Sequence, residues 1–89
     1  MPKMIYSDRF IDDASLIWSD RVMSELFTIL KNIEAFPEIG SSNVPGSVKD
    51  EFGQNVRKVV VGPFDLVYEY EKSNDMVYVH ALVRQRKAF

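Results

Sequence analysis

Residues 56–83 read VRKVVVGPFDLVYEYEKSNDMVYVHALV. Valine, tyrosine and leucine, which favour β-strands, are concentrated in three runs of this stretch: 56–61, 64–70 and 76–83. Gly62-Pro63 separates the first two runs and Lys72–Asp75 separates the last two, and both connections are short enough for tight turns. The stretch therefore predicts an antiparallel meander of three strands.

Two helices are expected before the meander, after a short strand at residues 3–6. Apolar side chains recur at helical spacing in two stripes, Phe10, Ala14, Ile17 and Trp18 in the first and Val22, Leu26, Ile29, Leu30 and Ile33 in the second. Ser7 and Ser19 stand where a hydroxyl can cap the start of each helix. We predict helices at 8–18 and 20–35, with a single bent helix as the alternative.

The connection from Pro37 to Gly53 is rich in glycine, serine and proline. Phe36-Pro37 ends the second helix, because the residue before a proline disfavours the α region. One short helical turn is expected near Val48–Phe52. The order of elements is therefore β-α-α-β-β-β. It predicts a two-layer α+β fold, a single domain of residues 1–89 in which the helical pair covers the C-terminal meander.

Composition places the chain among ordinary intracellular globular domains. Of its 89 residues 46% are hydrophobic and 27% are charged, and there is no cysteine. Disulfides and thiolate catalysis are thereby excluded, which fits a reducing cytoplasm. No secretory signal is recognisable, and no segment approaches the ~20 apolar residues of a membrane span. We expect a cytoplasmic protein with no membrane partner.

Charge is distributed unevenly along the chain. The net charge is −2, which argues against indiscriminate binding to nucleic acid. Residues 1–54 hold five basic and nine acidic side chains, whereas residues 55–89 hold six basic and four acidic ones. Any contact with phosphate is therefore expected in the C-terminal half, where Arg84, Arg86 and Lys87 lie close together.

Four strings resemble the RelE/ParE superfamily of toxins from bacterial type II toxin–antitoxin systems: residues 30–41, 55–61, 63–70 and 77–86. The resemblance implies a partner antitoxin, either homodimers or toxin–antitoxin hetero-oligomers, and neither cofactor nor metal. It also implies one of two actions. RelE-like members cut messenger RNA on the ribosome, whereas ParE-like members bind and poison DNA gyrase without hydrolysis.

For RNA cleavage, the resemblance assigns catalytic cations to Lys58 and Arg86, with Arg57, Arg84 or His80 assisting. Such a reaction needs a base, an acid and cations that stabilise the charged phosphorane. Asp65 departs from the RelE pattern, which has an arginine before the Leu-Val-Tyr run, and a carboxylate there would repel phosphate. The chain also ends at Phe89, without the aromatic C-terminal segment that some members use.

Structural roles compete with these catalytic ones. Asp65 could pair with Arg57 or Lys58 across the hairpin. Tyr68 and Tyr70 share a strand face with core residues, so core packing is expected for both. A lone histidine such as His80 is a poor metal site, since metal ligands come in clusters.

We first expect an RNA-cleaving toxin. A gyrase-binding toxin and a degenerate member that retains only antitoxin binding are the alternatives, so whether the chain is an enzyme stays open.

Overall fold

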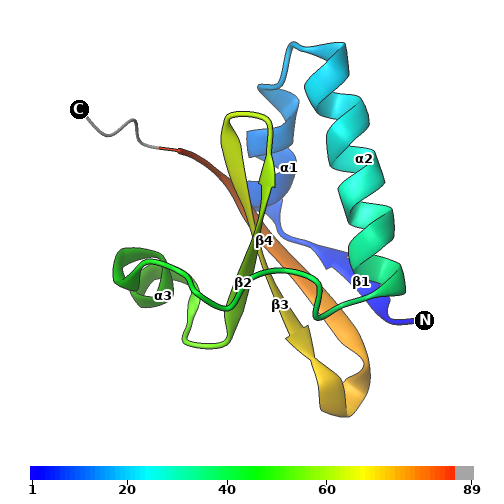
Figure 1. Cartoon of the computed structure of the whole chain (residues 1–89), viewed down its shortest axis with the longest axis vertical. Coiled ribbons are helices and arrows are strands. Elements are labelled where there is room, and N and C mark those ends of the chain that lie inside the picture. Colours follow the sequence, from blue (N-terminus) through cyan, green and yellow to red (C-terminus); the bar gives the residue numbers. More distant parts are fainter. Residues whose placement is uncertain (86–89) are drawn as a thin grey trace.

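The computed structural model describes residues 1–85 and places helices on both faces of one four-stranded sheet (Figure 1). The elements follow the chain in this order: β1 (Lys3–Tyr6), α1 (Asp8–Ser15), α2 (Asp20–Ala35), α3 (Gly46–Phe52), β2 (Val56–Val61), β3 (Phe64–Glu71), the 3₁₀ helix η1 (Lys72–Asn74) and β4 (Met76–Arg84). The predicted α+β class and element order are confirmed, and the predicted turn near Val48–Phe52 is α3.

The strand order across the sheet is β1-β4-β3-β2. The predicted meander is present, since β2 pairs antiparallel with β3 and β3 pairs antiparallel with β4. β1 adds to the far side of β4 in parallel, with Lys3 opposite Met76 and Tyr6 opposite Val79. A parallel neighbour requires a long crossover, and the two helices between β1 and the meander are part of it.

The β2–β3 turn depends on Gly62, whose φ of 54° lies in the left-handed region that favours glycine. A Cβ at this position would lie 2.9 Å from a methyl group of Val22 on α2. Glycine thus allows both the turn and the close approach of α2 to the hairpin.

The two predicted helices are separate, and serine hydroxyls cap both. Ser7 Oγ accepts from the Phe10 amide, and Ser19 Oγ accepts from the Val22 amide. The predicted end of the first helix is wrong, because α1 ends at Ser15 and Leu16 is its C-cap. Trp18, predicted to lie on the apolar stripe, is 94% exposed in the connection between the helices. None of the helices in residues 1–85 is long and apolar enough to span a membrane.

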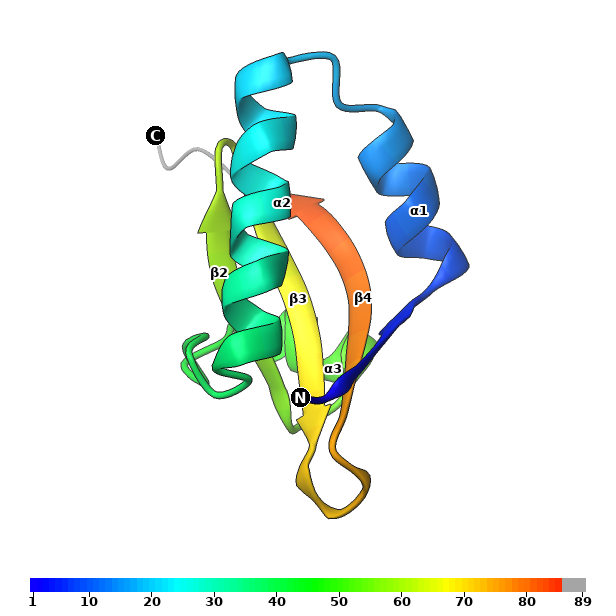
Figure 2. The same ribbon diagram turned by 90° about the vertical axis from the view of Figure 1, so that its right-hand side faces the viewer.

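The main core lies between the sheet and the helices α1 and α2 (Figure 2). Its buried members come from α1, α2 and all strands of the meander: Phe10, Leu26, Ile33, Val61, Leu66, Tyr68, Val77, Val79 and Leu82. Ile29 and Leu30, also in the predicted α2 stripe, are partly buried against it. The predicted packing of α2 on the sheet is confirmed.

A second, smaller core lies on the opposite face of the sheet. Val44, Val56 and Val67 are its buried members, and Val48 and Phe52 of α3 pack on it. The long connection after α2 therefore covers this face, and α3 lies on the side of the sheet away from α1 and α2 (Figure 2).

A β-bulge at His80 changes which face the end of β4 presents. Tyr68 pairs with Val79 and Val67 pairs with Ala81, so His80 is the extra residue. The N-terminal part of the chain holds the bulge, because Ser7 Oγ donates to the His80 carbonyl at 2.7 Å. The bulge brings Leu82 into the same core as Val79, whereas strict alternation would have put Leu82 on the other face.

Candidate functional site

A groove of about 570 Å³ lies between α3 and the end of the sheet. Pro45, Val48 and Glu51 line it on the α3 side, together with Ser47. The sheet side is lined by Lys58 of β2, Asp65 of β3, Val83 and Arg84 of β4, and Gln85, which follows β4. Two of the predicted site residues, Lys58 and Arg84, thus come together here.

Lys58 is held in the groove by an ion pair. Its Nζ lies 3.6 Å from Asp65 Oδ2, which confirms one of the two pairings expected from the sequence. The other carboxylate oxygen of Asp65 accepts from Gln85 Nε2 at 3.0 Å. The backbone of Lys58 exchanges two hydrogen bonds with Ser41, both 2.9 Å long. Lys58 is therefore paired with a carboxylate inside the groove.

Arg57 lies on the other face of β2 and does not reach this groove. Its Nη1 donates to the carbonyl oxygens of Gly40 and Glu38 at 2.8 and 3.1 Å. Its Nη2 lies 3.9 Å from the carboxylate of Glu38. The guanidinium of Arg57 thus binds the segment that follows α2, and its polar contacts are made within the fold.

His80 lies beneath α3 rather than in the groove. Its ring stacks on Phe52 with centroids 5.9 Å apart. Its Nε2 is buried and lies 3.5 Å from Glu69 Oε1, without hydrogen-bond geometry to any residue in the described part of the chain. The bulge separates His80 from Leu82, which lies in the main core on the other face. These contacts place His80 between α3 and the sheet.

Arg84 is the one exposed cation among the four predicted site residues that the structure describes. Its guanidinium lies 5.9 Å from the centre of the Phe64 ring, a cation–π contact at the end of β4. Arg86, the second principal catalytic prediction, lies outside the described residues.

The groove has no excess of positive charge among the residues that line it. Two cations, Lys58 and Arg84, and two carboxylates, Asp65 and Glu51, line it, although Glu51 is also paired with Arg9 of α1. Within residues 1–85 there is also no group of three or more histidine, aspartate or glutamate side chains placed to hold a metal ion. The described groove is therefore balanced in charge, with one internal ion pair and one exposed arginine.

Tyr68 has a role that its sequence position did not reveal. Its hydroxyl accepts from the Gly40 amide and donates to the Pro37 carbonyl, each at 2.8 Å. Burial raises the pKa of Tyr68, opposed by the Gly40 hydrogen bond and by Arg57, so the hydroxyl remains a donor at neutral pH. Gly40 also permits this approach, since a Cβ there would lie 2.7 Å from the tyrosine ring. Tyr68 and Arg57 together hold the exit of α2 on the sheet.

Solved toxin structures share this fold. The toxin chain in the intact E. coli RelBE toxin–antitoxin complex matches with a TM-score of 0.73 and 14% identity, over 98% of this chain and 100% of that one. An E. coli RelE mutant in complex with an antitoxin RelB peptide matches with a TM-score of 0.73 and 15% identity, over 97% of this chain and 85% of that one. The YoeB/ParE toxin from Agrobacterium tumefaciens matches with a TM-score of 0.72 and 13% identity, over 94% of this chain and 99% of that one.

At these identities the structural likeness establishes the fold alone. No curated protein sequence matches the chain significantly. Residues 4–89, however, match the family described as "ParE toxin of type II toxin-antitoxin system, parDE", which spans nearly the whole sequence. The chain therefore belongs to the ParE toxin family of type II toxin–antitoxin systems.

Proposed function

We propose that this toxin acts by binding DNA gyrase, without cutting RNA. The observation that carries the proposal is the ion pair between Lys58 and Asp65. A metal-free ribonuclease needs cations free to stabilise the phosphorane. Lys58 is paired with a carboxylate, and Arg57 is bound to backbone carbonyls on the other face. Membership of the ParE family favours the same reading.

We further propose that a cognate antitoxin binds and silences the chain. RelE, which shares the fold, is seen in complex with its antitoxin and with an antitoxin peptide. Because gyrase is a cytoplasmic enzyme, the toxin would act in the cytoplasm, and its resting form would be a toxin–antitoxin hetero-oligomer.

A double substitution in the groove tests this function. Lys58→Gln with Arg84→Gln removes both cations that line it, yet expression without antitoxin is expected to arrest growth as strongly as the unmodified chain does. Growth curves and mapping of transcript ends give the readout, with Lys58→Arg/Arg84→Lys as the charge-conserving control. A double variant that grows normally, while the control remains toxic and cuts transcripts, would overturn the gyrase proposal.

RNA cleavage is the second candidate, and it is favoured by the convergence of Lys58 and Arg84 on one groove. If this candidate holds, Arg86→Ala should lower the cleavage rate roughly 10²–10³-fold, by analogy with the loss of one oxyanion donor. Asp65→Arg, which frees Lys58 and adds a cation, should raise cleavage or leave it unchanged. Ribosome-dependent cleavage by the purified variants measures both effects. Unchanged cleavage in Arg86→Ala would remove that residue from the catalytic set.

A further inference from the structure

A polar groove, which we call the lysine groove, lies where β2 begins and β3 ends. Its volume is about 460 Å³, and it shares no lining residue with the groove beside α3. Three of its lining side chains are cations: Lys49 of α3, Arg57 of β2 and Lys72 of η1. Among the described residues that line it, only Glu38 is a carboxylate. Positive charge is therefore concentrated here, on a chain whose net charge is −2.

We infer that the lysine groove binds phosphate groups of a nucleic-acid backbone, with Lys49 and Lys72 as the cations that hold them. The inference rests on the proposed function for the identity of the polymer as DNA, because gyrase acts on DNA. The phosphate chemistry is argued from the groove itself.

The two lysines are available to a ligand, whereas the arginine is not. Within residues 1–85 neither ammonium group forms an ion pair. Lys49 and Lys72 come from separate segments, α3 and the turn between β3 and β4 (Figure 1). Arg57 instead donates to the carbonyl oxygens of Glu38 and Gly40 and lies near the Glu38 carboxylate. It adds positive charge to the groove, and the lysines supply the free donors.

Neutral donors surround the lysines. Ser42, Gln54 and Asn55 line the groove and are exposed, and within residues 1–85 their side chains make no hydrogen bond. Hydroxyl and carboxamide groups, together with lysine and arginine, are the side chains that contact phosphate oxygens in protein–DNA complexes. The Tyr70 hydroxyl also lines the groove, but it donates to Asp75 at 2.7 Å and is not counted among the donors.

The lining favours a phosphate over an acidic peptide. Val56 is the only aliphatic side chain among the described lining residues, and it is buried in the smaller core. Protein partners derive most of their binding energy from apolar and aromatic anchors, for which this groove has no pocket. Tyr70 is the only aromatic ring, so successive bases find no stacking platform either. The groove therefore suits the backbone, without regard to base sequence.

Two phosphate contacts make a weak and salt-dependent site. Each contact releases counterions, and two of them contribute about 1.8 to the slope of log Kd against log salt concentration. Such a site is compatible with an acidic chain that does not bind nucleic acid indiscriminately. It adds to a protein contact with gyrase and does not replace that contact.

The experiment measures binding of the purified full-length chain to a labelled DNA duplex by fluorescence anisotropy, at salt concentrations from about 50 to 200 mM. Lys49→Gln/Lys72→Gln should raise the Kd at the lowest salt roughly tenfold and lower the slope by about 1.8. Arg21→Gln/Lys31→Gln is the matched control. It removes the same charge from exposed positions on α2 outside the lysine groove, so the slope should not change.

A substitution of opposite sign tests the same site. Glu38→Gln removes the carboxylate from the lining, and it should lower the Kd roughly threefold, the scale of one exposed charge interaction. Thermal melting establishes that each variant is folded, and Lys72→Gln alone, at an exposed position, replaces the double variant if the latter is not.

Equal Kd values and slopes for the two double variants would overturn the inference, as would no binding of DNA by the unmodified chain at the lowest salt. Binding of a polyglutamate peptide that depends on the lysines, while DNA binding does not, would also overturn it. Tighter binding to an RNA duplex through the same lysines would overturn the assignment of DNA.

Gyrase inhibition by the unmodified chain is measured separately. Inhibition without lysine-dependent DNA binding contradicts this inference alone. Lysine-dependent DNA binding without inhibition contradicts the proposed function alone.

Discussion

Replacing Ile33 with alanine is expected to lower the free energy of unfolding by about 2–5 kcal/mol. Ile33 has no exposed surface and lies in the main core between α2 and the sheet. Removing its outer carbons leaves a cavity that the packed strands cannot close. For a domain of this size the loss is a large share of the total stability, and it should lower the melting temperature by roughly 10 °C or more.

Denaturant and thermal unfolding followed by circular dichroism measure this effect. Phe27→Ala is the matched control, because Phe27 lies on the same helix but is 58% exposed. It should cost far less than Ile33→Ala. Similar losses in both variants would mean that α2 does not pack on the sheet through the face described.

The second large effect is expected for Tyr68→Phe. This substitution removes one hydroxyl and leaves two partners without a hydrogen bond, the Gly40 amide and the Pro37 carbonyl. Each buried group left unpaired costs about 1–3 kcal/mol, unless water reaches it. The variant should therefore unfold at clearly lower denaturant concentration, with an unchanged slope.

Tyr70→Phe serves as the comparison for Tyr68→Phe. The Tyr70 hydroxyl also makes a hydrogen bond, 2.7 Å long to Asp75, but this bond is exposed. Its loss should cost far less than the loss of the Tyr68 hydroxyl, because water replaces the partner. If Tyr68→Phe were as stable as Tyr70→Phe, the contact between Tyr68 and the exit of α2 would not contribute to stability.

Much of the fold could be predicted because its local signals agree with one another. The valine-rich runs, the turn at Gly62-Pro63 and the serine caps each determine their element through short-range chemistry. Trp18 shows where this fails. Its spacing from Phe10 and Ala14 suits a helix, but α1 ends at Ser15 before the pattern is complete. Periodicity alone does not mark where a helix stops.

The candidate site was less predictable, because it depends on contacts between distant residues. The bulge at His80 shifts the alternation of β4 and is held by Ser7, 73 residues earlier in the chain. Arg57 is bound by carbonyls of the segment that follows α2. Neither contact leaves a signal in the strand sequence. The pairing of Lys58 with Asp65 could be anticipated, since hairpin geometry brings neighbouring strands together.

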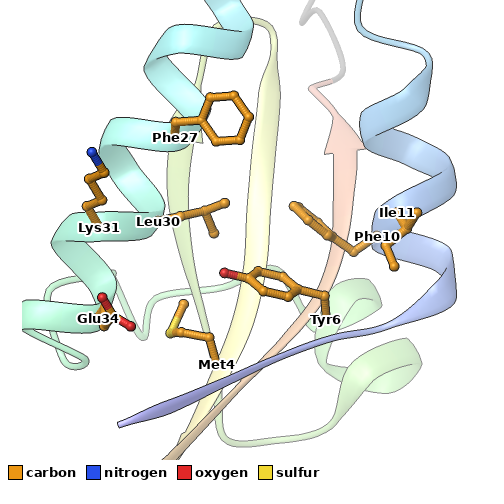
Figure 3. Close-up of a pocket in the computed structure, with 8 residues that line it drawn as sticks. All are labelled: Met4, Tyr6, Phe10, Ile11, Phe27, Leu30, Lys31 and Glu34. Atoms are coloured by element: carbon orange, nitrogen blue, oxygen red, sulfur yellow. The ribbon is translucent and has the colours of Figure 1, made fainter. Parts of the chain in front are cut away.

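Two grooves on this chain differ in the chemistry of the side chains that line them. The groove beside α3 is lined by equal numbers of cations and carboxylates, and Lys58 pairs with Asp65 there. A second groove, between α1 and α2, is lined mainly by apolar side chains (Figure 3). A chain that acts through protein contacts needs surfaces of the second kind, because buried aromatic and aliphatic side chains supply most of the binding energy at interfaces.

Supercoiling of relaxed plasmid by purified DNA gyrase, at increasing concentrations of the purified chain, tests the proposed function most directly. We predict that supercoiling falls as the chain is added and is restored by the antitoxin. Ribosomes programmed with messenger RNA, given the same chain, should yield no new transcript ends. Full supercoiling activity at every concentration, together with cleavage of ribosome-bound messenger RNA, would contradict the proposal.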